Sequence, residues 1–137
     1  MRNQDRIFKS LFDLTTQVIP AFGARISAFV TDKNNNIISA GFNSKKTHPF
    51  QAKFAKNEFA IQLHAEIDAI KNALRTVNVD DLSKHNLYIC RVKQASRGMP
   101  FITGLSKPCQ GCMRAIATFG IKNVFYTEED AADFVCL

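Results

Sequence analysis

The sequence has no run of apolar residues long enough to span a bilayer, so it contains no candidate membrane helix. Its N-terminal segment also lacks the continuous apolar core of a secretory signal peptide, because Asp5 and Asp13 interrupt it. An amphipathic transit peptide would avoid such acidic residues. These absences predict a cytoplasmic protein with no membrane partner.

Long polar tracts, internal repeats and linker-like stretches are also missing from the 137 residues. Hydrophobic residues make up 46% of the chain and include 12 phenylalanines, which is enough apolar side chain to fill a core without covalent staples. A chain of this length and composition suits one compact unit. We therefore expect a single domain over residues 1–137.

Cysteine is scarce, with four residues, and in a reducing compartment these are not expected to form two disulfides. Acidic residues are outnumbered, because 18 lysines and arginines face 12 aspartates and glutamates, which gives a net charge of +6. A basic surface favours anionic ligands such as nucleotides or nucleic acid but does not distinguish between them.

Apolar residues at helical spacing predict amphipathic helices, and short apolar runs bounded by turn residues predict strands. The helices are expected at 5–19, 62–76, 108–120 and 128–137, and the strands at 24–32, 36–44, 86–93 and 123–127. The first two strands flank an Asn-rich turn, which predicts an antiparallel hairpin. The later alternation of strand and helix predicts parallel strands joined by right-handed crossovers. The expected fold is α/β, with a mixed central sheet and helices on both faces.

Two cysteines open the helix expected at 108–120. Cys109 and Cys112 follow Pro108 at a spacing of three, and residues i and i+3 share one face of a helix. The partial positive charge at a helix N-terminus favours thiolates, and two thiolates provide half of a zinc site. A pair of core or redox cysteines is the alternative interpretation.

A histidine and a glutamate begin the helix expected at 62–76. His64 can supply a third metal ligand, and catalytic zinc keeps three protein ligands and leaves its fourth position to water. Glu66 projects from the same turn in a different direction and can carry protons beside that water. The alternative interpretation of Glu66 is an ordinary surface glutamate.

The fragments His64-Ala65-Glu66 and Pro108-Cys109-Gln110-Gly111-Cys112 match the signature H-x-E followed by P-C-x-x-C. With the order of elements around them, they resemble the cytidine deaminase-like superfamily in its histidine form, over nearly the whole chain. The resemblance implies the three-layer fold of that superfamily. It also implies a homo-oligomer, since the family usually assembles into dimers or larger rings.

The same resemblance assigns roles to the motif residues. His64, Cys109 and Cys112 would hold one Zn²⁺ per chain. Glu66 would take a proton from water, pass it to the ring nitrogen of the base and later protonate the departing amine, so that ammonia leaves. The backbone of Ala65 is expected to contact the substrate. The net reaction would be hydrolytic deamination of cytosine to uracil or of adenine to hypoxanthine.

Within the superfamily the closest resemblance is to the deoxycytidylate deaminases, which predicts dCMP as the substrate. Nucleoside cytidine deaminases usually have cysteine where this chain has His64, and the riboflavin-pathway deaminases space their two cysteines farther apart. Bacterial tRNA adenosine deaminases typically have glutamate in place of Lys107 and methionine in place of Gly111. The segment Gly41-Phe42-Asn43 resembles the Gly-x-Asn segment of the deoxycytidylate group, so Asn43 is a candidate sugar contact. Capping of a turn is the other interpretation of Asn43.

Several cations are candidates for binding a nucleotide 5′-phosphate, namely Lys45, Lys46, Arg97 and Lys107. Lysines alternate with phenylalanines in the loop at 45–59, which is typical of single-stranded nucleic acid binding and also of a solvated loop anchored by core phenylalanines. An editing deaminase acting on tRNA or single-stranded DNA is therefore the alternative enzyme.

A binding module with a structural zinc is the alternative outside enzymes. In such a module Cys90 would be the fourth ligand and would close the site, whereas His48 and His85 are expected away from the metal. The segment 94–107 departs from the family pattern, in which the strand leads almost directly into Pro-Cys. It lies next to the expected pocket and could form a lid or lengthen an edge of the sheet.

Overall fold

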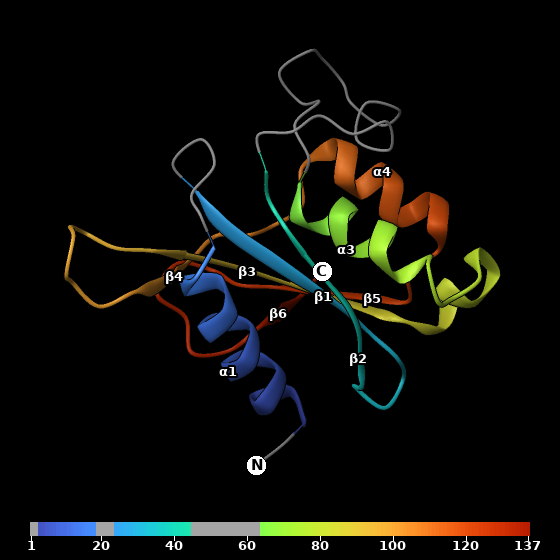
Figure 1. The fold of residues 1–137 in the computed structure, drawn as a ribbon, viewed down its shortest axis with the longest axis horizontal. Coiled ribbons are helices and arrows are strands. Elements are labelled where there is room, and N and C mark those ends of the chain that lie inside the picture. The colour runs from blue at the N-terminus through green and yellow to red at the C-terminus, as the bar shows by residue number, and fades with distance from the viewer. Residues whose placement is uncertain (1–2, 19–23, 45–63) are drawn as a thin grey trace.

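A computed structural model describes residues 3–18, 24–44 and 64–137. The fold is a mixed sheet between one N-terminal helix and a pair of later helices (Figure 1). No helix within the described ranges is long and apolar enough to cross a membrane.

The sheet has six strands in the order β2-β1-β3-β5-β6, and β4 pairs with the second half of β3. β1 and β2 form the antiparallel hairpin predicted around the Asn-rich turn. β3 and β5 run parallel, which confirms the parallel pairing predicted for the second half. The strands are β1 (Arg25–Thr31), β2 (Ile37–Phe42), β3 (Asn86–Lys93), β4 (Ile102–Gly104), β5 (Asn123–Tyr126) and β6 (Val135–Cys136).

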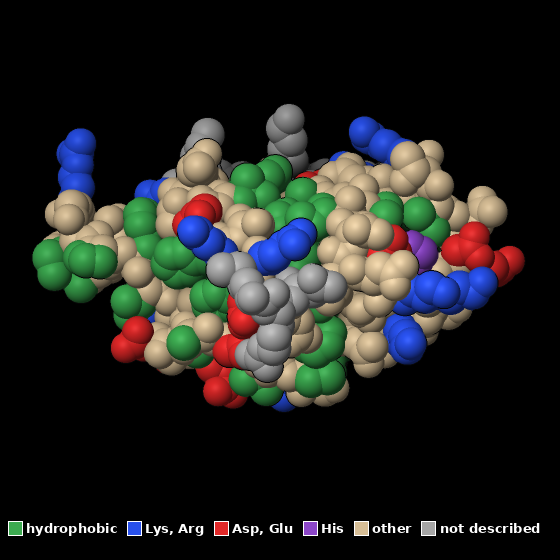
Figure 2. All heavy atoms as spheres, turned by 90° about the horizontal axis from the view of Figure 1, so that it is seen from below, with side chains coloured by type: hydrophobic (Ala, Val, Ile, Leu, Met, Phe, Trp, Pro, Cys, Tyr) green, Lys and Arg blue, Asp and Glu red, His purple; other side chains and the backbone are tan. Residues whose placement is uncertain are grey.

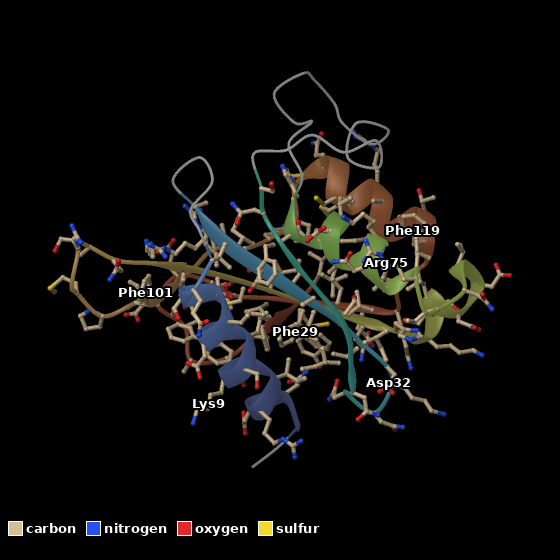
Figure 3. All side chains as sticks on the ribbon, viewed as in Figure 1. Lys9, Phe29, Asp32, Arg75, Phe101 and Phe119 are labelled. Carbon is tan, nitrogen blue, oxygen red and sulfur yellow. The ribbon has the colours of Figure 1, made fainter. Side chains whose placement is uncertain are left out.

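Helices cover both faces of this sheet, as predicted. On one face, Ile7 and Leu11 of α1 (Asn3–Thr16) pack against Phe29 and other apolar residues of the strands. On the other face lie α3 (Ala65–Ala73) and α4 (Gln110–Phe119), which cover Ala28 and its neighbours (Figure 1). Because successive strand residues point to opposite faces, adjacent residues of β1 belong to different cores. Figure 3 shows Phe29 on the α1 side and Phe119 on α4.

The helix predicted at 128–137 is wrong. Val135 and Cys136 instead form β6, which pairs antiparallel with β5. Asp130 has a positive φ of 45°, which a helix does not allow. Pairing with the edge of β5 provides hydrogen-bond partners for the backbone of this segment. It also brings Phe134 into the core below α1, where its ring centre lies 5.1 Å from that of Phe8.

The segment 94–107 lengthens an edge of the sheet, because it contains β4. With the second half of β3 this short strand forms a hairpin that reaches away from α3 and α4 (Figure 1). Phe101 lies in this hairpin (Figure 3), and the Arg25 guanidinium lies 5.2 Å from the centre of its ring. Between α3 and β3 the chain also forms a short 3-10 helix, η2 (Val79–Lys84), which the sequence pattern did not predict.

Candidate active site

His64 lies at the N-cap of α3, in an extended backbone conformation (φ −89°, ψ 154°). The helix predicted over 62–76 therefore begins at Ala65 and ends at Ala73, followed by turns to residue 76. Ile67 and Ile70 on its apolar face are fully buried, as the periodicity predicted. The extended N-cap takes the His64 imidazole off the helix and toward α4, where its ring meets Cys112.

The two cysteines lie at the start of α4. Cys109 is the N-cap, and its Sγ accepts a hydrogen bond from the backbone N–H of Cys112 at 3.4 Å. A thiol sulfur thus takes the place that a serine or aspartate oxygen usually has at a helix start. The helix begins at Gln110, two residues later than predicted, and ends at Phe119. Its C-cap is Gly120, whose φ of 71° is the left-handed conformation expected there.

The three predicted ligands converge. Nδ1 of His64 lies 3.3 Å from Sγ of Cys112 and 3.4 Å from Sγ of Cys109, and all the ligand atoms lie within 4.8 Å of one another. For bond lengths of about 2.0 Å to nitrogen and 2.3 Å to sulfur, the edge of a zinc tetrahedron is roughly 3.6 Å. The group could therefore hold one metal ion through Nδ1 and the two sulfurs. It is the one such group of three within the described ranges.

The three candidate ligands differ in exposure. Cys112 is buried between α3 and α4, Cys109 is exposed, and His64 is intermediate. An ion held here would be fixed from the protein side and reachable from the side of Cys109.

Cys90 is not part of this group. It lies on β3 in the core below α1, on the face of the sheet opposite α3 and α4. Burial raises the pKa of its thiol to about 11, and the hydroxyls of Thr15 and Thr127 lie beside it. His85 caps η2, with its Nδ1 2.7 Å from the carbonyl of Asp81, and His48 lies outside the described residues.

Glu66 is buried, with 5% of its surface exposed, so it is not the surface glutamate of the alternative interpretation. Burial raises the pKa of its carboxyl, although the nearby His64 and a hydrogen bond from the Cys112 thiol act in the opposite direction. A carboxyl whose pKa lies above its usual range can both accept and deliver a proton near neutral pH.

The two cysteine sulfurs lie in hydrogen-bonding contact. This contact lowers the pKa of Cys109 to about 4 and raises the pKa of Cys112. The hydrogen bond to Cys109 also raises the pKa of His64, although burial opposes it. Metal binding needs deprotonated sulfurs and a neutral imidazole, so it would release protons from this cluster.

α3 is fastened to β2 by contacts that sequence reasoning missed. Ser39 Oγ donates to the carbonyl of Ala69 at 2.7 Å, and the Asp68 carboxylate accepts from the N–H of Phe42 at 3.0 Å. A Cβ on Gly41 would lie 2.2 Å from the backbone nitrogen of Ala69, so only glycine permits this approach. In the sequence, the only sign of this close approach is the glycine in the segment Gly41-Phe42-Asn43.

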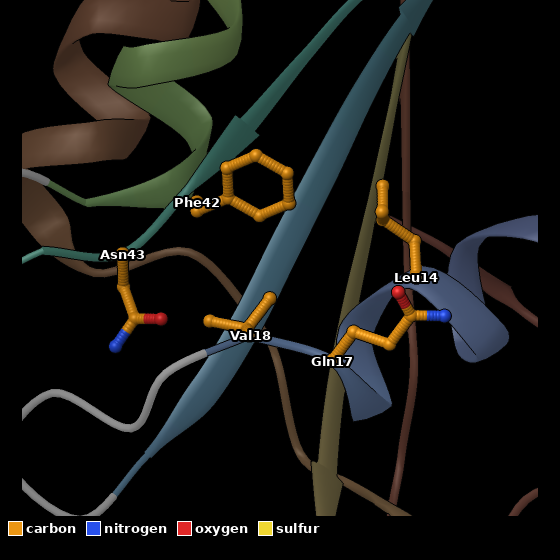
Figure 4. Close-up of a pocket in the computed structure, with 5 residues that line it drawn as sticks. All are labelled: Leu14, Gln17, Val18, Phe42 and Asn43. Carbon is orange, nitrogen blue, oxygen red and sulfur yellow. The ribbon is translucent and has the colours of Figure 1, made fainter.

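Asn43 lies at the end of β2, at the rim of a pocket of about 390 Å³. Its Oδ1 accepts from the N–H of Ile26 and its Nδ2 donates to the carbonyl of Ala24, so β1 holds the side chain in place. Figure 4 shows the pocket between the end of α1 and the end of β2. It is lined by Leu14, Gln17, Val18, Phe42 and Asn43.

The candidate phosphate ligands do not all come to the site. Lys107 is exposed and stands two residues before Cys109. Arg97 lies in the loop that joins β3 and β4, at the opposite end of the molecule from α3 and α4 (Figure 1). Lys45 and Lys46 lie outside the described residues.

Comparison with known proteins supports the chemistry of this site. No curated protein matches the chain. Residues 1–128 match the family described as the cytidine and deoxycytidylate deaminase zinc-binding region. The match contains both fragments of the signature and nearly all of the fold described above. The chain therefore belongs to the cytidine and deoxycytidylate deaminase family, and it is a zinc-dependent deaminase of nucleotides or nucleosides.

Proposed function

We propose that the protein converts the cytosine of dCMP to uracil with release of ammonia, with His64, Cys109 and Cys112 as zinc ligands and Glu66 as the proton carrier. The observation that carries the proposal is the buried Glu66 carboxyl against Cys112, inside a cluster of three ligands that is open on the side of Cys109. A structural zinc has four protein ligands and needs no such carboxyl, and Cys90 lies on the other face of the sheet.

Zinc, when bound, lowers the pKa of a water molecule to about 7 and so supplies the nucleophile. Glu66 would accept a proton from the attacking water and deliver it to the ring nitrogen of cytosine, while the oxygen of that water bonds to the amino-bearing carbon. Glu66 then carries the second proton to the amine, and ammonia leaves as the carbonyl of uracil forms. Burial of Glu66 excludes bulk water from these transfers.

Ala65 and Asn43 orient the substrate in this proposal. Ala65 is the first residue of α3, and N–H groups in the first turn have no partner within their helix, so its N–H can donate to the base. Asn43 follows β2 and contacts the sugar in this proposal, whereas the pocket beside it is lined by α1 and contains none of the candidate zinc ligands.

A phosphate group on the substrate suits the charge of the chain. The net charge is +6, and Lys107 is exposed beside the metal ligands. A phosphate held by lysine gains charge-assisted hydrogen bonds worth roughly 1.5–3 kcal/mol each. Two such bonds, from Lys107 and a lysine of the pair Lys45 and Lys46, would raise kcat/KM by roughly two to four orders of magnitude.

The test is an ammonia assay with dCMP, deoxycytidine and a short single-stranded DNA. We expect kcat/KM for dCMP to exceed that for deoxycytidine by at least about 100-fold. Lys107→Met should lower kcat/KM for dCMP by about 10-fold or more and leave deoxycytidine unchanged. Lys122→Met, at an exposed lysine between α4 and β5, is the matched control and should change neither. Equal values of kcat/KM for dCMP and deoxycytidine would show that the enzyme does not recognise the phosphate.

The polymer substrate is the alternative outcome of this assay. The face shown in Figure 2 carries lysines and arginines scattered among acidic and apolar side chains. A nucleic-acid backbone would bind along a basic path that leads to the candidate ligands. Rapid editing of the oligonucleotide with no action on dCMP would establish the editing deaminase instead.

A further inference from the structure

β3 changes its pairing partner halfway along its length. Its first half pairs with β5 as far as Ile89 and Tyr126, and its second half pairs with β4 from Arg91 and Gly104 onward. The ladder is interrupted between these two registers, and an interrupted ladder leaves buried backbone groups that need other partners. Side-chain hydroxyls provide them.

Ser106 joins the two sides of this interruption. Its N–H donates to the carbonyl of Thr127 at 2.9 Å, and its Oγ accepts from the N–H of Thr127 at 2.8 Å. The same oxygen lies 3.0 Å from the carbonyl of Ile89 and can donate to it. Ser106 is 6% exposed, so water does not compete for these bonds.

Thr127 completes the junction from the end of β5. Its Oγ1 donates to the carbonyl of Gly104 at 2.7 Å and accepts from the N–H of Arg91 at 3.2 Å. The two hydroxyl oxygens lie 2.9 Å apart. Since each hydroxyl has one proton and Thr127 donates its own to Gly104, the Ser106 proton has two alternative acceptors, Thr127 Oγ1 and the carbonyl of Ile89. The fully buried Thr127 therefore ties β3, β4 and Ser106 together.

The junction lies three residues before the first cysteine ligand. The segment 94–107 leaves the sheet as a hairpin and returns to it at Ser106, and Pro108 then restricts Lys107 to an extended conformation. Few rotatable bonds separate the buried serine from Cys109. The position of Cys109 relative to His64, 45 residues earlier, therefore depends on where Ser106 is held.

We propose that Ser106 is a positioning residue for the zinc site, which acts by fixing the return of the 94–107 segment to Thr127 and Ile89. Residues that orient metal ligands without touching the metal commonly change metal affinity by about 10–100-fold when they are lost. The proposal depends on the zinc site and not on the substrate, so a failure to deaminate dCMP would leave it standing.

The test measures zinc affinity by competition with a chromophoric chelator, and the visible spectrum of the cobalt-substituted protein. Ser106→Ala should weaken zinc binding by about 10-fold or more and shift the thiolate–cobalt bands. Thr103→Ala is the matched control, because Thr103 is 2% exposed in the same hairpin and bonds Glu128 and Ala131 instead of the cysteine segment. The control should lose stability and keep both the affinity and the spectrum.

Two more variants complete the test. Ser106→Thr keeps the hydroxyl group, so its zinc affinity should lie within about threefold of the wild-type value. If Ser106→Ala does not fold, Thr127→Val removes the partner hydroxyl while leaving the shape, and should weaken zinc binding by at least about threefold. The proposal is overturned if neither alanine nor valine changes the affinity, or if Thr103→Ala weakens it as much as Ser106→Ala.

Discussion

At the scale of single residues, the Glu66 carboxyl group is buried against Cys112. The Cys112 thiol hydrogen-bonds to it, and burial raises its pKa above the usual range. Glu66→Gln keeps the size of the side chain but cannot carry a proton. We expect this variant to bind one zinc per chain and to lose roughly 10²–10⁴-fold in kcat.

Zinc content by elemental analysis and turnover by ammonia release check this prediction together. Glu128→Gln, at an exposed glutamate beyond β5, is the control and should keep full activity. Turnover by Glu66→Gln within about tenfold of the wild type would show that another group carries the proton.

The cysteines should differ sharply in reactivity. In the metal-free protein Cys109 has a pKa of about 4 and is a thiolate at pH 7, whereas burial keeps Cys90 protonated up to a pKa of about 11. Because the thiolate is the nucleophile, iodoacetamide at pH 7 should modify Cys109 quickly and Cys90 only after unfolding. Peptide mass spectrometry reads out both sites, with the exposed Cys136 as an internal reference.

Zinc should protect Cys109 from the same reagent. If Cys90 reacts as fast as Cys109 in the folded, metal-free protein, its place in the core below α1 is wrong. If zinc fails to protect Cys109, that sulfur is not a ligand.

At the scale of elements, the attachment of α3 to β2 sets the place of His64 and Glu66. A Cβ added at Gly41 would lie 2.2 Å from the nitrogen of Ala69 and 2.5 Å from the carbonyl oxygen of Ala65. These are backbone atoms, so the whole helix must move. Gly41→Ala should lower the free energy of unfolding by about 3 kcal/mol and weaken zinc binding, because His64 is the N-cap of the displaced helix.

Gly98→Ala is the control for this prediction. Gly98 has a φ of 86° and no heavy atom within 4 Å of an added Cβ, so it tests strain without a clash. Gly98→Ala should lower the free energy of unfolding by about 1 kcal/mol and leave zinc affinity unchanged. Urea unfolding of both variants provides the comparison, and equal costs would contradict the close approach of α3 to β2.

At the scale of the whole molecule, the metal would join two parts of the fold that lie far apart in the sequence. His64 precedes α3, whereas both cysteines begin α4, and the two helices meet around Ile67 and Cys112. A ligand that binds only the folded state raises the free energy of unfolding by about 2.7 kcal/mol when its concentration is 100 times its Kd. Removing zinc should therefore lower the Tm by roughly 10 °C.

Calorimetry before and after chelation measures this effect. Added Zn²⁺ should restore the Tm, whereas Mg²⁺ should not, because thiolates and imidazole suit zinc and not magnesium. An unchanged Tm after complete removal of the metal would contradict the coupling of metal binding to the stability of the fold.

The parts of the molecule that could be predicted are those that local spacing encodes. Cys109 and Cys112 share a helical turn, Gly120 ends their helix, and Ile67 and Ile70 fall on one buried face, because a helix brings residues three or four apart together. The helix predicted at 128–137 failed for the converse reason. Its acidic first turn resembles a helix start, but the open edge of β5 decided the conformation of Val135.

Residue type and local spacing are enough to predict the chemistry of this protein, because the pattern of His64, Glu66, Cys109 and Cys112 indicates a metal site with a proton carrier. Packing, by contrast, places Cys90 on the far face of the sheet and buries Glu66 beside Cys112. Packing also brings Gly41 against α3 and the Ser106 hydroxyl against the carbonyl of Ile89. These contacts join residues from different strands and helices, and their geometry depends on how the sheet packs rather than on the spacing within any one segment.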